Sequence, residues 1–228
     1  MKNLSPVRAI SLREQVVEQI RIAIIEGQLK PGDRITEKAL TDQLNVSRTP
    51  IREALILLER EGLIVTVPYH GNFVRNFTVD DVSAIFSMRT TLENFAAQLN
   101  YAKFADDDHA YLQDLIDTQR AYISKGDFKQ VRSTDVAFHR YIINFANHPL
   151  LIKNWAEIGA QIAALLYLRA EAIPDYDEFL AVKDHQSIVD AYKKRDVEAV
   201  FSANKRINER VAGECLYAVK TLLEDETS

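Results

Sequence analysis

The stretch VSRTPIREAL, residues 46–55, decides the fold of the first third of the chain. In a helix beginning near Arg48, Arg48 and Arg52 share one face, because helical residues four apart are neighbours. Three apolar residues fall on another face and can pack inward: Ile51, Ala54 and Leu58. Pro50 is compatible with this start, since the first turn of a helix has no backbone donor to lose. The spacing predicts a helix over 48–60 with a basic, exposed beginning.

The segments around this helix predict a small domain. Helical periodicity precedes it, and a hairpin pattern with a central turn follows it. The predicted elements are helices over 12–26 and 36–44 and strands over 63–67 and 72–75. Three helices followed by a two-stranded wing are the layout of a winged helix-turn-helix. We therefore assign residues 1–76 to such a domain.

The remainder of the chain, residues 77–228, shows helical periodicity throughout. The predicted helices begin at Thr78 and continue over about 106–124, 128–146, 149–172, 176–193 and 196–222. Only 7 Gly and 6 Pro occur, which is few for the many turns of a sandwich or barrel. We expect a mainly α protein, in which the winged domain is followed by a six-helix antiparallel bundle.

Composition excludes several classes of protein. The 228 residues carry a net charge of −5, and the single Cys215 excludes an internal disulfide or a thiolate-rich metal site. Charge is uneven: residues 1–76 hold 11 Lys+Arg against 9 Asp+Glu, and residues 77–228 hold 17 against 24. Any DNA contact is therefore expected in the first part. No apolar run could span a bilayer and the first residues lack a signal-peptide core, so we expect a cytoplasmic protein without membrane contact.

The predicted start of the 48–60 helix suits a major groove. Arg48 and Arg52 can bond guanine bidentately, and the hydroxyls of Ser47 and Thr49 can bond phosphates. Three further residues are candidate DNA contacts: Lys38 for phosphate, and His70 and Gly71 at the wing tip for the minor groove. The alternative is that these charges are solvated surface residues, which is the usual environment of Arg and Lys.

The N-terminal motifs resemble the DNA-binding domain of GntR-family bacterial transcription regulators. The matching runs are LKPGDR (29–34), TEKAL (36–40), VSRTPIREAL (46–55), Leu58, EGL (61–63) and Gly71. The resemblance implies that the chain binds double-stranded operator DNA as a homodimer. It also implies DNA contacts at Lys38, Ser47, Arg48, Thr49, Arg52, His70 and Gly71.

The C-terminal part resembles the all-helical, FCD-type effector domain of the FadR-like branch of this family. The matching runs are RTTLE (89–93), DVAFH (135–139), NHPL (147–150) and HQSI (185–188). The resemblance implies that residues 77–228 bind a small-molecule effector and dimerise.

Three residues of this part form a candidate metal site. Asp135 and His139 leave the same helix face, and His185 could add a third ligand from a later helix. The resemblance implies a fourth ligand, a His, at a position that Ile207 occupies here. Two interpretations stay open: a three-ligand site for Zn, Ni or Mn, or a metal-free pocket in which the two His only form hydrogen bonds.

Arg89 is the candidate partner of an anionic effector, an organic acid, if it faces the interior of the bundle. The alternative is an internal pair with Glu93 or Asp135. We therefore expect a ligand-responsive transcriptional regulator, acting as a repressor at a pseudo-palindromic operator. The second hypothesis is a metal-dependent enzyme that uses the three candidate metal ligands, although no general base is apparent beside them.

Overall fold

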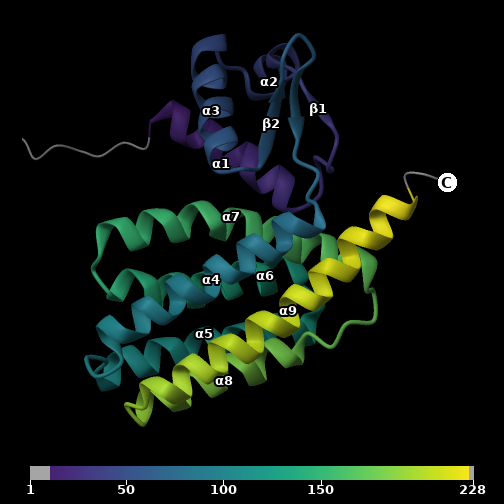
Figure 1. Cartoon of the computed structure of the whole chain (residues 1–228). Helices are drawn as coiled ribbons and strands as arrows, with labels where there is room; N and C mark the ends of the chain where they lie inside the picture. The colour runs from purple at the N-terminus through teal and green to yellow at the C-terminus, as the bar shows by residue number, and fades with distance from the viewer. Residues whose placement is uncertain (1–10, 226–228) are drawn as a thin grey trace, which may run out of the picture. The chain divides into compact units, whose positions relative to one another are not determined.

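The computed structural model describes residues 11–225, and the chain divides into two compact units between Asn76 and Phe77 (Figure 1). The prediction of a mainly helical fold is confirmed. Among the described residues, no helix has the length and apolar character needed to cross a membrane. Residues 1–10, which carry the prediction about a signal peptide, lie outside the described residues.

The N-terminal unit holds the predicted helices and hairpin, together with one additional strand. Its elements are α1 (Leu12–Ile25), β1 (Arg34–Ile35), α2 (Glu37–Leu44), α3 (Arg48–Arg60), β2 (Ile64–Val67) and β3 (Gly71–Val74). Ser11 caps α1 in a capping box with Glu14, and Thr36 caps α2 by accepting a hydrogen bond from the Ala39 amide. These caps satisfy backbone donors that a helix start leaves free, which sets where each helix begins.

The wing is a three-stranded antiparallel sheet with the order β1-β3-β2. Strand β1 was not predicted, because a two-residue strand is too short to show periodicity in the sequence. Arg34 lies opposite Phe73 and Ile35 lies opposite Asn72. Ile35 is buried, whereas Arg34 is exposed, so the strand attaches an apolar anchor and a cation to the wing.

Helix α3 is held by apolar contacts on one side. It packs against α1, α2 and β2. The prediction of its inner face is confirmed, because Ile51, Ala54 and Leu58 are completely buried. Burial of each large apolar side chain contributes about 1.5–3 kcal/mol, which fixes the rotation of α3 and leaves its opposite face to solvent.

The C-terminal unit is an all-helical bundle. Its elements are α4 (Val79–Asn100), α5 (Asp106–Lys125), α6 (Phe128–Phe145), α7 (Pro149–Ala172), α8 (Phe179–Lys193) and α9 (Val197–Asp225). Helix α4 begins directly after Thr78, the predicted start, and Thr78 is its N-cap residue. Helix α8 begins three residues later than predicted, because the preceding segment places Tyr176 over the guanidinium of Arg169 and pairs Glu178 with it.

Several helices of this bundle converge on a polar interior. Helix α4 packs on α6, α7 and α9, while α5 packs on α6 and α8, and α8 packs on α9. Charged and polar side chains are buried between them: Arg89, Glu93, Gln119, His139, Arg169, Asp184, His185 and Asn208. Burying such groups is costly unless they are paired or hydrogen-bonded. The contacts among them therefore mark this interior as a candidate site.

Candidate functional site

The start of α3 exposes the polar side chains that the sequence analysis selected. These are Ser47, Arg48, Thr49 and Arg52. Ser47 is the N-cap residue of α3, but its side chain makes no capping hydrogen bond. Its hydroxyl and the free amides of the first turn are therefore available to a phosphate.

Arg52 is held in place by an ion pair with α2. Its Nε donates to Glu37 Oε1 at 2.7 Å, while 61% of its side chain stays exposed. The hydrogen bond and the charge of Glu37 raise the pKa of Arg52, so it stays a cation. Only its Nε is engaged by a residue that the structure describes, which leaves both terminal amino groups for a bidentate bond.

The other candidate DNA contacts also reach solvent. Lys38 is exposed in the first turn of α2, and His70 is exposed in the turn between β2 and β3. The His70 amide donates to the Val67 carbonyl at 3.0 Å, which closes this turn. Gly71 has φ +107°, a conformation that favours glycine. The geometry is compatible with DNA contact at each of these positions.

In the C-terminal unit, the three candidate metal ligands lie together. Asp135 and His139 come from α6, and His185 comes from α8. His185 Nε2 is 3.2 Å from Asp135 Oδ1 and 3.3 Å from His139 Nε2. One ligand atom from each residue lies within 4.8 Å of the others. Both His side chains are at most 4% exposed, so a ligand there would be held away from bulk solvent.

The outward nitrogen of each His ring has an acceptor. His139 Nδ1 lies 2.9 Å from Glu93 Oε1, and His185 Nδ1 lies 2.9 Å from Gln119 Oε1. A carboxylate only accepts, so His139 Nδ1 donates to Glu93, and Gln119 presents its amide oxygen to His185 Nδ1 while its amide nitrogen lies 3.5 Å from the Val131 carbonyl. The Nε2 atoms therefore face the cluster, which is the arrangement by which a neighbouring group orients a metal-binding His.

Arg89 lies inside the bundle, which is the position that binding of an anionic effector requires. It also pairs internally with Glu93, which was the alternative interpretation of this residue. Its Nε donates to Glu93 Oε1 at 2.9 Å, and its Nη2 is 2.6 Å from His139 Nε2. Burial raises the pKa of Glu93, but the charge of Arg89 and the hydrogen bonds from Arg89 and His139 outweigh burial and hold it far below its ordinary value. Burial and Arg89 lower the pKa of His139. His139 Nε2 therefore has a lone pair, which Arg89 occupies.

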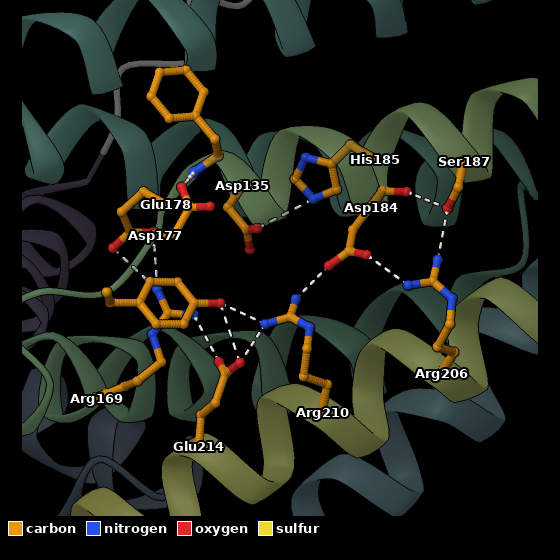
Figure 2. Close-up of polar contacts among 12 residues, drawn as sticks. Asp135, Arg169, Asp177, Glu178, Asp184, His185, Ser187, Arg206, Arg210 and Glu214 are labelled. Atoms are coloured by element: carbon orange, nitrogen blue, oxygen red, sulfur yellow. Dashed lines mark hydrogen bonds and ion pairs between the residues drawn. The ribbon is translucent and has the colours of Figure 1, made fainter.

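A second ionic network lies beside the cluster, between α7, α8 and α9 (Figure 2). Arg169 donates to Glu178 at 3.0 Å and pairs with Glu214 at 3.4 Å. Arg210 pairs with both Asp184 and Glu214. Figure 2 shows that Asp135 and His185 lie directly next to this network, so the cluster and the network form one polar interior.

A cavity of about 30 Å³ lies within this interior. It has room for an ion or about two to three waters, since one water needs about 10–15 Å³. Its lining includes Arg89, Arg132, Asp135, His139, Arg169, His185, Ile207 and Arg210. Arg132 differs from the other three arginines, because it makes no hydrogen bond or ion pair with a described side chain, and its Cζ lies 5.9 Å from the centre of the Tyr167 ring. Burial and the charge of Arg169 lower the pKa of Arg132, although the charge of Glu178 opposes them.

Several residues of this site were not predicted from the sequence. Gln119 was not selected, because it lies 66 residues from His185 and an isolated amide gives no sequence signal. Arg132 lies one helical turn before Asp135 and could have been found from that spacing. Ile207 lines the cavity, which agrees with its predicted place beside the candidate ligands.

Comparisons with known families cover most of both units. Residues 12–74 match the family described as "Bacterial regulatory proteins, gntR family", and residues 84–210 match the "FCD domain". The first match contains α3 and the wing, and the second contains all three candidate metal ligands.

Individual relatives agree with these matches. The chain is 31% identical to YcbG, an HTH-type transcriptional regulator of Bacillus subtilis, over 82% of each chain. It is 27% identical to the gluconate operon transcriptional repressor of Bacillus licheniformis, covering 80% of this chain and 76% of that one. Among solved structures, it is similar to McbR/YncC of E. coli, with a TM-score of 0.78, 27% identity, and coverage of 89% and 95%.

Proposed function

Because the chain belongs to the GntR family of bacterial regulatory proteins and carries an FCD domain, we propose that it represses transcription as a homodimer bound to a pseudo-palindromic operator. A small organic acid in the C-terminal unit switches it. Family membership makes the chain a DNA-binding transcriptional regulator and removes the reason for the enzyme hypothesis. Because bacterial DNA lies in the cytoplasm, the proposed regulator acts there.

The exposed start of α3 is the observation that carries the DNA-binding part. Arg48 and Arg52 extend from a helix whose opposite face is completely buried, so no rearrangement is needed to present them. The ion pair with Glu37 limits the rotamers of Arg52, which lowers the entropy lost when it binds a base. Ser47, Thr49 and Lys38 contact phosphates around the groove in this proposal, while His70 and Gly71 reach the minor groove.

Arg52→Ala tests this assignment. An operator is first selected from random duplexes with the wild-type protein, and its affinity is then measured by gel shift. Loss of a bidentate guanine contact costs about 1–3 kcal/mol and relaxes the sequence preference at one base pair. Arg60→Ala is the matched control, since Arg60 is an exposed Arg at the other end of α3, about 12 Å from Arg52 along the helix at 1.5 Å per residue. Unchanged affinity and preference for Arg52→Ala would defeat the assignment.

We further propose that Asp135, His139 and His185 hold a divalent metal. The two inward Nε2 atoms and the Asp135 carboxylate provide the nitrogen and oxygen donors that Zn, Ni or Mn accept. When bound, the metal would supply a positive centre for an effector carboxylate. Arg89 must release the lone pair of His139 Nε2 for this, and it can do so while keeping its bond to Glu93.

The effector's anionic group meets Arg132 in this proposal, with Arg89 on the metal-ligand side of the same cavity. Arg132 supports this role because its half-buried guanidinium lines the cavity and lacks a carboxylate within ion-pair distance among the described side chains. An organic acid would supply that counter-charge. Since the cavity of about 30 Å³ is smaller than a metabolite, effector binding must move side chains of the lining. This movement is what couples the ligand to the conformation of the unit.

Two measurements test the pocket. Metal analysis of protein purified without a His-tag or chelator should give about one divalent ion per chain, and sub-stoichiometric metal would refute the metal assignment. A thermal-shift screen of organic acids, with and without divalent metals, should find a stabilising acid. Arg132→Gln should abolish that thermal shift while the protein still binds metal. Arg140 is an exposed Arg on α6, and the control variant Arg140→Gln should keep the shift. A shift retained by Arg132→Gln would remove Arg132 from the effector site.

A further inference from the structure

Arg34 belongs to the wing, although it precedes the helix-turn-helix in the sequence. It lies opposite Phe73 in the β1–β3 pairing. Alternate residues of a strand share one face, so its side chain lies on the same face as Phe73 and Gly71. A Cβ placed on Gly71 would be 3.7 Å from Arg34 Nε and 3.8 Å from Arg34 Nη2. The guanidinium therefore extends over Gly71 toward the turn at the wing tip.

The Arg34 guanidinium has no hydrogen-bond or ion-pair partner among the described residues. Arg34 is exposed and makes no hydrogen bond or ion pair with the residues described between 11 and 222. Two other arginines of this unit are paired: Arg52 with Glu37, and Arg21 with Glu61 at 2.7 Å. Arg34 therefore contributes no charge pairing to the fold, while its position at the wing is fixed by the strand pairing of β1.

The turn next to it presents an exposed aromatic residue at its tip. Tyr69 is fully exposed, with a relative exposure of 107%, and has φ 66°. A left-handed backbone is unfavourable for a residue other than glycine, and the Tyr69 ring has no aromatic partner among the described residues. The exposed Tyr69 ring is therefore available to a partner at the wing tip.

We propose that Arg34 reads a narrow, A·T-rich minor groove at the part of each operator half-site that the wing covers. This rests on the proposed function, in which the wing meets DNA. A narrow minor groove has an enhanced negative potential that attracts an inserted Arg. A G·C pair places the guanine amino group in that groove, whereas A·T presents only acceptors. Arg34, which only donates, discriminates between the two.

Replacing guanine by inosine distinguishes recognition through the minor groove from recognition through the major groove. An I·C pair has the major-groove pattern of G·C but lacks the guanine amino group. The full-length protein is titrated with its selected operator, in which the A·T pairs under the wing are kept, changed to G·C, or changed to I·C. Wild type should bind the G·C operator roughly tenfold more weakly, as for one mismatched pair, and should recover on I·C.

The variants give the deciding comparison. Arg34→Ala should bind all three operators with equal affinity, while Arg60→Ala, which removes the same charge from the far end of α3, should retain the wild-type order. Retained discrimination in Arg34→Ala, equal wild-type binding of I·C and G·C, or selected operators without A·T under the wing would each overturn the proposal. Failure of the α3-based function is separate, because it appears as operator binding that does not depend on Arg52.

Discussion

Glu93→Gln should strongly destabilise the C-terminal unit. The Glu93 carboxylate accepts from Arg89 Nε, His139 Nδ1 and Asn208 Nδ2, each at 2.9 Å. Arg89 and Glu93 are only 3% and 4% exposed. Gln keeps the shape but removes the charge, which leaves the buried guanidinium uncompensated. Breaking a buried pair in this way costs about 3–5 kcal/mol.

The assay is thermal unfolding followed by fluorescence of Trp155, the only Trp of the chain, which lies in this unit. A domain of 150–250 residues loses about 2–4 °C per kcal/mol, so the expected fall in Tm is about 6–20 °C. Glu209→Gln is the matched control, because its pair with Lys205 is solvent-exposed and spans 3.9 Å. It should change the free energy of unfolding by less than about 0.5 kcal/mol.

The double variant Arg89→Met/Glu93→Gln separates the pair from the packing around it. Replacing a whole buried pair by neutral groups of similar volume is often close to neutral, so the double variant should recover most of the lost stability. It also keeps the test informative if Glu93→Gln does not fold. If Glu93→Gln costs no more than Glu209→Gln, the reasoning that Arg89 depends on Glu93 is wrong.

Three further predictions concern the same unit. Ile207→His should tighten zinc binding roughly tenfold or more by closing the ligand set, measured by competition with a chromophoric chelator; unchanged affinity would contradict the placement of the site. Burial raises the pKa of the Cys215 thiol to about 12. The native protein should therefore not react with a thiol reagent at pH 8, whereas the denatured protein should react. Rapid labelling of the native protein would contradict the buried position of Cys215. Gly213 lies on an open helix face, so Gly213→Ala should raise the free energy of unfolding by about 0.5–1 kcal/mol. Gly159→Ala should not raise it, because the new Cβ would lie 3.0 Å from the Trp155 ring. Equal changes of Tm in the two variants would refute this packing argument.

Residues that act within one element could be predicted from the sequence. The buried and exposed faces of α3 follow from the spacing of Ile51, Arg48 and Arg52, because helical geometry alone decides which residues share a face. The caps at Ser11 and Thr36 follow in the same way, since a cap bonds to an amide only three residues later. Strand β1 could not be predicted, because its two residues are held by pairing with β3 and not by local preference.

The polar interior depends on contacts between distant residues. Asp135 and His139 could be paired from the sequence, because they are one turn apart. The sequence alone could not show that Arg89 Nη2 lies 2.6 Å from His139 Nε2, across 50 residues, or that Gln119 orients His185. Those distances are set by how α4, α5, α6 and α8 pack together.

The sequence by itself thus determined the helical class, the winged layout and the basic start of α3, because each rests on spacing within a single segment. The tertiary structure decided which buried charges have partners. It paired Arg89 with Glu93 and Arg169 with Glu178, and it left Arg132 against the Tyr167 ring. The physical reason is that ion pairing depends on atoms within about 4 Å, and only the packing of helices brings atoms from distant segments that close.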